Sequence, residues 1–139
     1  MALRYTSPNL QVVAGGTIRP SRIVKISTAA DNTVLESAAA TSPNIGIAQQ
    51  GTRRAPGTGD DDGNAALVDE QLGIYGPGSG LAPCQAGGTV VAGDAITSDG
   101  SALGIATTTE GNVVVGWSLE AAVTADIFAV LTQPCFYAS

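Results

Sequence analysis

The 139-residue sequence contains no histidine, a single lysine and few aromatic residues, which make up 4% of the chain. Histidine is the side chain whose ordinary pKa lies nearest neutral pH, so its absence removes most catalytic triads and hydrolytic metal centres. Without an imidazole, no general base of that kind activates Cys84 or the serines as nucleophiles. We therefore expect a protein that is not an enzyme and carries no cofactor. The enzymatic alternative is a small β enzyme whose catalytic residues are shared between the chains of an oligomer.

Positive charge is also scarce. Lys and Arg total 6 against 12 Asp and Glu, for a net charge of −6, and Arg53-Arg54 is the only basic pair. Nucleic acids and anionic membranes require a basic surface that replaces phosphate counterions. The longest uncharged stretch, residues 71–93, holds seven Gly and two Pro and so predicts loops and turns rather than a membrane span. We expect neither a nucleic-acid partner nor a membrane partner.

Metal and phosphate sites are poorly matched. The two cysteines, Cys84 and Cys135, lie in no CxxC motif, so we interpret them as small buried hydrophobes or free thiols, with one disulfide as the alternative. The acidic run Asp60–Asn64 fails as a calcium loop, because the sixth position is Ala65 and the twelfth is Gln71. The run Gly76–Gly80 lacks the Lys-Ser/Thr of a phosphate-binding loop. We interpret both runs as surface loops and expect no bound metal.

The sequence is rich in turn residues, with 18 Gly and 7 Pro, and these separate short β-branched runs. This pattern predicts an all-β fold, a compact antiparallel β-barrel or sandwich of short strands with little helix. We expect a flexible N-terminal arm at residues 1–9, one domain at 10–133 with an exposed loop at 51–64, and a C-terminal tail at 134–139. The expected strands are 10–14, 23–26, 33–35, 44–48, 95–97, 103–107, 113–119 and 127–131.

Three local features permit sharper predictions. Asp99-Gly100 between apolar runs predicts a tight hairpin turn, since both residues tolerate positive φ. Strict alternation places Trp117 on one face with Val113 and Val115, either as a core anchor or as an interface anchor. The run AGGTI at 14–18 is similar to AGGTV at 86–90, and IGIA at 45–48 is loosely similar to VGWS at 115–118. These pairs indicate either a duplication or the chance recurrence of a common motif.

The C-terminal half contains a set of characteristic runs: Gly87-Gly88-Thr89-Val90, Gly93-Asp94-Ala95-Ile96, Asp99-Gly100, Val115–Ala122 and Ile127–Leu131. In these runs it resembles the capsid decoration (cement) proteins of tailed bacteriophages. The resemblance covers about residues 67–131 and, more loosely, 11–50. The sequence departs from the family pattern at Ala125-Asp126, where the family often has a glycine-containing turn, and in its tail Pro134–Tyr137.

The resemblance implies a virion protein that resides in the host cytoplasm during assembly and then binds the outer surface of the assembled capsid. It would clamp neighbouring major capsid subunits together as a homotrimer. For contact with the major capsid protein we predict Leu3, Arg4, Tyr5 and Leu10. For contact between subunits we predict Arg53 and Arg54 in the 51–64 loop, and Phe136 and Tyr137 in the tail. The alternative function is a β-sandwich ligand-binding or adhesive module, for example one that binds carbohydrate.

Overall fold

The computed structural model describes residues 7–53 and 62–138, and this part of the chain folds into ten strands without a helix. The strands are β1 (Leu10–Ala14), β2 (Ile23–Ile26), β3 (Thr33–Glu36), β4 (Asn44–Ala48), β5 (Gln71–Tyr75), β6 (Leu81–Gln85), β7 (Ala95–Ser98), β8 (Gly104–Ala106), β9 (Val113–Ser118) and β10 (Ile127–Phe136). The all-β prediction is confirmed, and every strand expected from the sequence is present.

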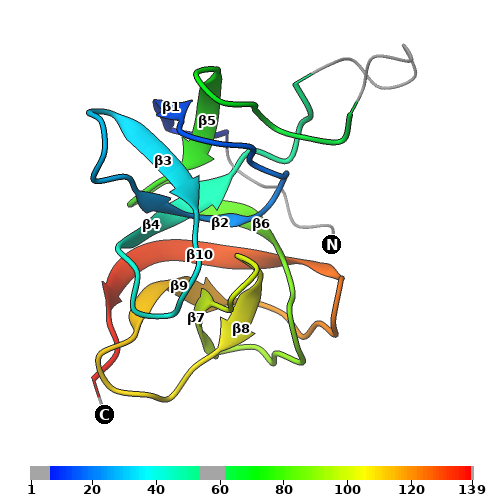
Figure 1. Ribbon diagram of the computed structural model, residues 1–139. Coiled ribbons are helices and arrows are strands. Elements are labelled where there is room, and N and C mark those ends of the chain that lie inside the picture. The colour runs from blue at the N-terminus through cyan, green and yellow to red at the C-terminus, as the bar shows by residue number, and fades with distance from the viewer. Residues whose placement is uncertain (1–6, 54–61, 139) are drawn as a thin grey trace.

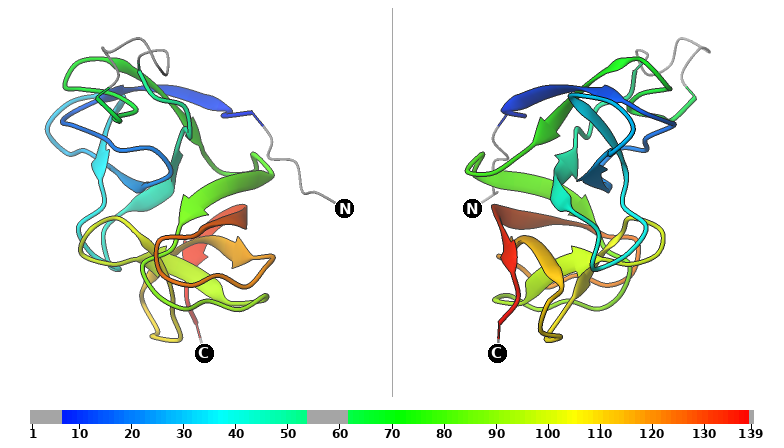
Figure 2. Two further views of the ribbon diagram at one scale, coloured as in Figure 1. Left: turned by 90° about the vertical axis from the view of Figure 1, so that its right-hand side faces the viewer. Right: turned by 60° about the vertical axis from the view of Figure 1, so that its left-hand side comes forward.

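The strands form two stacked units (Figures 1 and 2). Strands β1 to β5 close into a barrel in the order β1-β3-β2-β4-β5, which we call the barrel. Strands β6 to β10 form a five-stranded sheet in the order β6-β10-β9-β7-β8, which we call the second sheet. Its two edge strands meet at one parallel bridge between Ala86 and Gly104, so the second sheet curls almost into a barrel of its own.

The second sheet repeats the topology of the barrel. In each unit the first strand pairs antiparallel with the fifth, the second with the third and fourth, and the fourth with the fifth. The parallel pairing of β1 with β3 recurs as the parallel bridge between Ala86 and Gly104. The isolated bridge between Ile18 and Ala66 recurs between Val90 and Ala122. The shared motifs of the sequence thus occupy matching places, which supports the duplication interpretation.

Individual backbone hydrogen bonds recur as well. Ala14 N donates to Glu70 O at 2.8 Å in the barrel, and Ala86 N donates to Asp126 O at 2.8 Å in the second sheet. Asp69 and Ala125, which precede these acceptors, both have positive φ, at 67° and 77°. In the resemblance to decoration proteins, Ala125-Asp126 replaces a turn that often contains glycine, and Ala125 has a backbone conformation that glycine adopts most easily. We call two residues in such matching places repeat-equivalent.

One long connection distinguishes the two units. Residues 49–70 join β4 to β5, whereas residues 119–126 join β9 to β10, so the barrel has 14 more residues here (22 against 8). The expected exposed loop at 51–64 has this same length and coincides with the extra segment. The loop is therefore an addition to the barrel rather than part of the repeated fold.

The outer surface of the barrel packs against the second sheet. Ile23, Ile47 and Tyr75, on strands β2, β4 and β5, belong to one buried cluster with residues of the second sheet, among them Cys84 and Phe128. A separate cluster that includes Val24, Leu72 and Ile74 fills the barrel itself. The two units therefore pack against each other through one shared apolar cluster, while the barrel keeps a core of its own.

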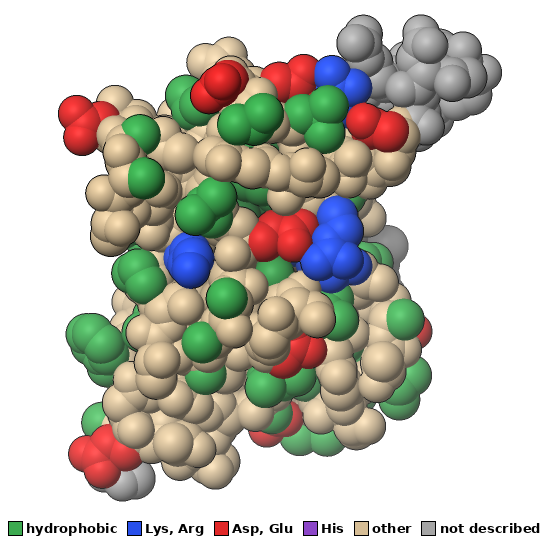
Figure 3. Space-filling model, viewed as in Figure 1, with side chains coloured by type: hydrophobic (Ala, Val, Ile, Leu, Met, Phe, Trp, Pro, Cys, Tyr) green, Lys and Arg blue, Asp and Glu red, His purple; other side chains and the backbone are tan. Residues whose placement is uncertain are grey.

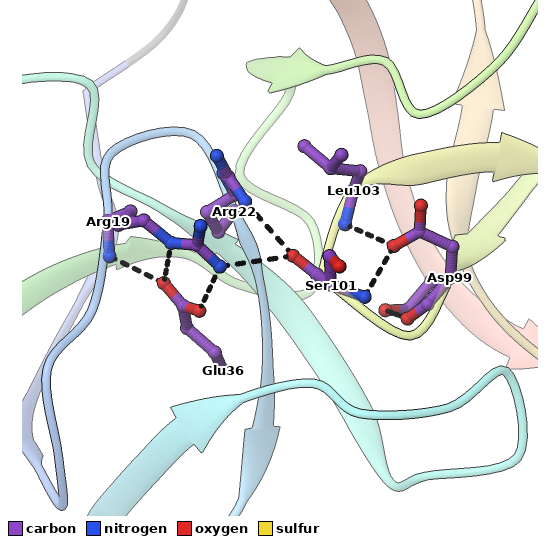
Figure 4. A network of polar contacts seen from close by, with 7 residues as sticks. Arg19, Arg22, Glu36, Asp99, Ser101 and Leu103 are labelled. Atoms are coloured by element: carbon purple, nitrogen blue, oxygen red, sulfur yellow. Dashed lines mark hydrogen bonds and ion pairs between the residues drawn. The ribbon is translucent and has the colours of Figure 1, made fainter. Parts of the chain in front are cut away.

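A polar network lies beside this junction (Figure 4). Glu36 accepts hydrogen bonds from the backbone N of Arg19 at 2.7 Å and from its guanidinium at 2.8 and 3.1 Å. Across the junction, the carbonyl oxygen of Ser101 accepts from Arg22 at 3.0 Å and from Arg19 at 3.4 Å. The side-chain hydrogen bond to Glu36 raises the pKa of Arg19, whereas burial lowers the pKa of Arg22. The network fixes the loop after β7 against the barrel.

The predicted tight turn at Asp99-Gly100 is wrong, although the β7–β8 hairpin exists. Ser98 pairs with Gly104, so the loop spans five residues, and its positive φ is at Ala102. The Asp99 carboxylate accepts from the backbone N of Ser101 at 2.8 Å and of Leu103 at 3.0 Å. This side-chain acceptor holds a wider loop than an Asp-Gly turn requires.

Two other expectations are also corrected. Residues 71–93 contain strands β5 and β6 and are not only loops. Trp117 is 37% exposed whereas Val115 is fully buried, so the residues predicted to share one face do not share one environment. The pairing of β9 with β10 shifts register between Gly116 and Val114, opposite Thr132 and Cys135. Such an irregularity bends the sheet and changes how side chains point along it.

Candidate interaction surface

The predicted capsid-contact residues lie mostly outside the described part of the chain. Leu3, Arg4 and Tyr5 are among the residues that the structure does not describe. Leu10 begins β1 and is 39% exposed. Just before it, Asn9 is held to the fold, because its backbone N donates to Ile74 O at 3.1 Å and its Oδ1 accepts from Gly76 N at 2.8 Å. The last residue of the predicted arm is therefore part of the folded domain.

Of the predicted subunit-contact pair in the loop, Arg53 is described and Arg54 is not. The Arg53 guanidinium forms a bidentate ion pair with the Glu70 carboxylate, in which Nε and Nη2 each donate to a carboxylate oxygen at 2.6 Å. Its Nη1 lies 3.4 Å from Oδ2 of Asp62. This hydrogen bond to Glu70 raises the pKa of Arg53. The pair borders an open hollow of about 450 Å³ that is also lined by Gln49 and Gln71. In the isolated chain Arg53 thus ties the start of the connection between β4 and β5 to Glu70 at its end.

The predicted tail residues extend the second sheet. Strand β10 continues through Phe136, which pairs with Val113 of β9, so Pro134 to Phe136 belong to a strand. Phe136 is 75% exposed. Tyr137 is half-buried, and its backbone N donates to Asn112 O at 2.8 Å. An aromatic ring this exposed at the end of a strand is available to a partner.

A group of exposed apolar side chains covers the outer side of β9 and β10. Of its members, the sequence had singled out only Trp117. Trp117 pairs directly with Leu131, and Ile127 lies on the same side of β10. Leu119 joins them, because its backbone N donates to Ala129 O between these two positions. We call Trp117, Leu119, Ile127 and Leu131 the apolar face, and they are 37–45% exposed. Clustered exposed apolar side chains mark interaction sites on soluble proteins.

The charged and nucleophilic groups of the described residues form neither a metal site nor a broad basic patch. On the side drawn in Figure 3, basic side chains are few and scattered. Among residues 7–53 and 62–138, no three acidic or cysteine side chains lie together in a way that could hold a metal ion. That same part of the chain contains no helix that could cross a membrane. The apolar face is thus the most distinctive surface feature of the described structure.

The two cysteines are free and lie in different environments. Cys84 is buried in the core of the second sheet, and burial raises the pKa of its thiol to about 12. Cys135 lies exposed near the end of β10. The interpretation as a buried hydrophobe is therefore right for Cys84, and Cys135 is a free thiol.

No protein-family model and no curated protein matches the sequence. Five chains among the solved structures match its fold. One is titled "The crystal structure of head fiber gp8.5 N base in bacteriophage phi29", with a TM-score of 0.64 over 89% of this chain and 92% of that chain. The chain has the fold of a bacteriophage head-fibre base. At 17% sequence identity the similarity is one of fold alone. It spans nearly the full length of both chains and therefore includes both β units.

Proposed function

We propose that this chain is a non-enzymatic structural protein of a phage virion that binds the outer surface of the assembled head. The observation that carries the proposal is the fold shared over nearly the whole chain with the base of a phage head fibre. The resemblance of residues 67–131 to capsid decoration proteins supports the same class of function from the sequence side. The exposed apolar face and Phe136 supply surfaces for protein contact.

The mechanism we propose is stabilisation by mass action. A ligand that binds only the assembled shell stabilises it, by about 2.7 kcal/mol per site at a free concentration 100 times its Kd. A decoration protein that spans neighbouring major capsid subunits opposes their separation in this way. The net charge of −6 favours this role over DNA packaging, because like charges repel the protein from nucleic acid.

The direct test is co-sedimentation of the purified chain with expanded heads of the source phage that lack decoration. We expect saturable binding and a higher temperature of DNA release from the decorated heads. Unexpanded shells and bovine serum albumin serve as controls. Absence of binding to expanded heads would overturn the proposal, and selective binding on a glycan array would favour the adhesive alternative.

The predicted arm is tested by deleting residues 2–6. This deletion spares Asn9, whose hydrogen bonds to Ile74 and Gly76 belong to the fold. We expect unchanged thermal unfolding and loss of head binding, because the deletion removes Leu3, Arg4 and Tyr5. A matched variant that scrambles residues 2–6 controls for length. Full head occupancy by the deletion variant would remove the arm from the proposed mechanism.

A further inference from the structure

The internal repeat allows the apolar face of the second sheet to be compared with the matching surface of the barrel. Trp117 and Leu131 of the second sheet are repeat-equivalent to Ile47 and Tyr75 of the barrel. Ile47 is completely buried and Tyr75 is 6% exposed, because both pack against the second sheet. Within one chain, this strand surface is therefore covered by a β unit of the same fold. In the second sheet, the matching surface has no cover among the described residues.

The other two residues of the apolar face differ in polarity from their counterparts in the barrel. Leu119 and Ile127 are repeat-equivalent to Gln49 and Gln71, which border the open hollow of the barrel. At these four positions of the barrel, the two that border the hollow carry polar side chains and the two that are covered carry apolar ones. In the second sheet all four positions are apolar while the isolated chain leaves them exposed. This pattern is expected if the whole apolar face is covered in the assembled state.

Among the described residues, the barrel has a matching end on which no second unit packs. Inside one chain, Ile23, Ile47 and Tyr75 share a cluster with Ala82, Cys84 and Val115, all three of which are fully buried. The repeat-equivalent residues of the barrel are Leu10, Val12 and Ile45. Leu10 is 39% exposed, and Val12 and Ile45 are only partly buried against the barrel core. We call Leu10, Val12 and Ile45 the barrel mouth.

One pair of opposite charges occupies matching places on the two surfaces. At the intrachain junction, Thr97 of the second sheet donates through Oγ1 to the carbonyl oxygen of Ala40 in the barrel, at 3.3 Å. The residue repeat-equivalent to Thr97 is Lys25, beside the barrel mouth. The residue repeat-equivalent to Ala40 is Glu110, which is exposed on the second sheet. The same junction formed between two chains would bring the only lysine of one chain to a glutamate of the next. The Arg22–Ser101 contact has no such counterpart, because Asp94 stands in the place of Arg22.

We propose that the apolar face of one chain packs on the barrel mouth of a second copy of this chain, head to tail. The contact reproduces between chains the junction that joins barrel and second sheet within a chain. Because its two surfaces are different, the contact is heterologous, and such contacts close into rings or continue as chains. The proposed homotrimer is one such ring. The inference rests on the internal repeat and is independent of the proposed virion role.

The first test measures oligomeric state by sedimentation equilibrium and mass photometry over a range of concentrations. We expect an oligomer for the wild type and at least about tenfold weaker assembly for Trp117→Lys, because central aromatic residues dominate interface energy. Val68→Lys is the matched control, since Val68 is an exposed apolar residue of the barrel outside both surfaces. Circular dichroism and thermal unfolding confirm that both variants fold.

Two results would overturn the proposal. One is a wild type that stays monomeric at all concentrations, even if it binds phage heads through Trp117. The other is an oligomer that Trp117→Lys leaves intact; if Phe136→Lys dissociates that oligomer, the contact lies at the end of β10 instead.

The second test decides the head-to-tail arrangement. Leu10→Lys damages the barrel mouth and leaves the apolar face intact, and Trp117→Lys does the reverse. Each variant alone should be monomeric, and an equimolar mixture should form a one-to-one dimer through its one intact pair of surfaces. A symmetric contact between two apolar faces would not rescue assembly in the mixture, and that result would overturn the proposal.

The third test exchanges the charges. Lys25→Glu alone and Glu110→Lys alone should each weaken assembly, because each places like charges across the contact. The double variant Lys25→Glu/Glu110→Lys should regain most of the wild-type affinity at low salt. Additive loss in the double variant would show that these residues do not meet and would overturn the proposed register.

Discussion

Strand β10 offers two phenylalanines whose truncation should have very different effects. Phe128 is fully buried in the core that joins the two units, and its ring abuts Gly104: a Cβ built there would lie 3.3 Å from Phe128 Cζ. Phe136, eight residues later on the same strand, is 75% exposed. Phe128→Ala removes the largest fully buried side chain and leaves a cavity, so the free energy of unfolding should fall by about 3–5 kcal/mol. Phe136→Ala should change it by no more than about 0.5 kcal/mol.

Both variants are compared with wild type by urea unfolding and by calorimetry at one protein concentration. For a chain of this size each kcal/mol shifts Tm by about 3–4 °C, so Phe128→Ala should lower Tm by about 9–20 °C. An unchanged urea m-value would show that the effect is on stability rather than on the extent of unfolding. A loss below about 1 kcal/mol for Phe128→Ala, or an equal loss for Phe136→Ala, would refute the assignment of the junction core.

Three further predictions concern the close contact at Gly116 and the two cysteines. Gly116→Ala should destabilise the fold by about 1–3 kcal/mol, because its new Cβ would collide with the carbonyl oxygen of Leu131 on β10. Gly88→Ala is the control, since its Cβ would lie 3.9 Å from the nearest atom, and an equal loss in urea unfolding would contradict the explanation. In thiol labelling of the native protein, only Cys135 should react rapidly, and Cys84 should react on unfolding. The pKa of Cys84 is raised from 9.0 to about 12, so its contribution to stability is complete below pH 9 and is lost as the pH rises toward 12. Cys84→Ala should therefore lose less stability than wild type over that pH range, and parallel pH profiles would contradict this account.

Strands were predictable from the sequence where β-branched residues cluster between turns, as in β2 and β9. The segment that contains β5 and β6 was misread because Gly73 and Pro83 weaken a strand pattern. Pro83 is tolerated because β6 lies at the edge of the second sheet, where one side of the strand needs no ladder hydrogen bond. Gly73 is suited to a crowded place, since a Cβ there would lie 3.2 Å from Gln11, Gln49 and Pro8. Both reasons depend on neighbours that are distant in sequence.

For the interaction surface, the sequence correctly directed attention to Trp117 but left its role open between core and interface. Phe136 was predicted as a contact residue, and its 75% exposure leaves that prediction open to test. Leu119, Ile127 and Leu131 were not predicted as surface residues, because an apolar strand residue is indistinguishable from a core residue in one sequence. The similarity between residues 14–18 and 86–90 was the one signal that, followed through, would have located the apolar face.

The sequence by itself determined the all-β fold, the place of most strands and the absence of imidazole side chains, because these follow from composition and local pattern. Only the tertiary structure decided which apolar surfaces are covered. Ile47 and Trp117 occupy the same place in two copies of one fold, yet one is buried and the other exposed. The difference arises because the barrel has a second β unit packed against it and the second sheet does not, and that stacking is a property of the whole molecule.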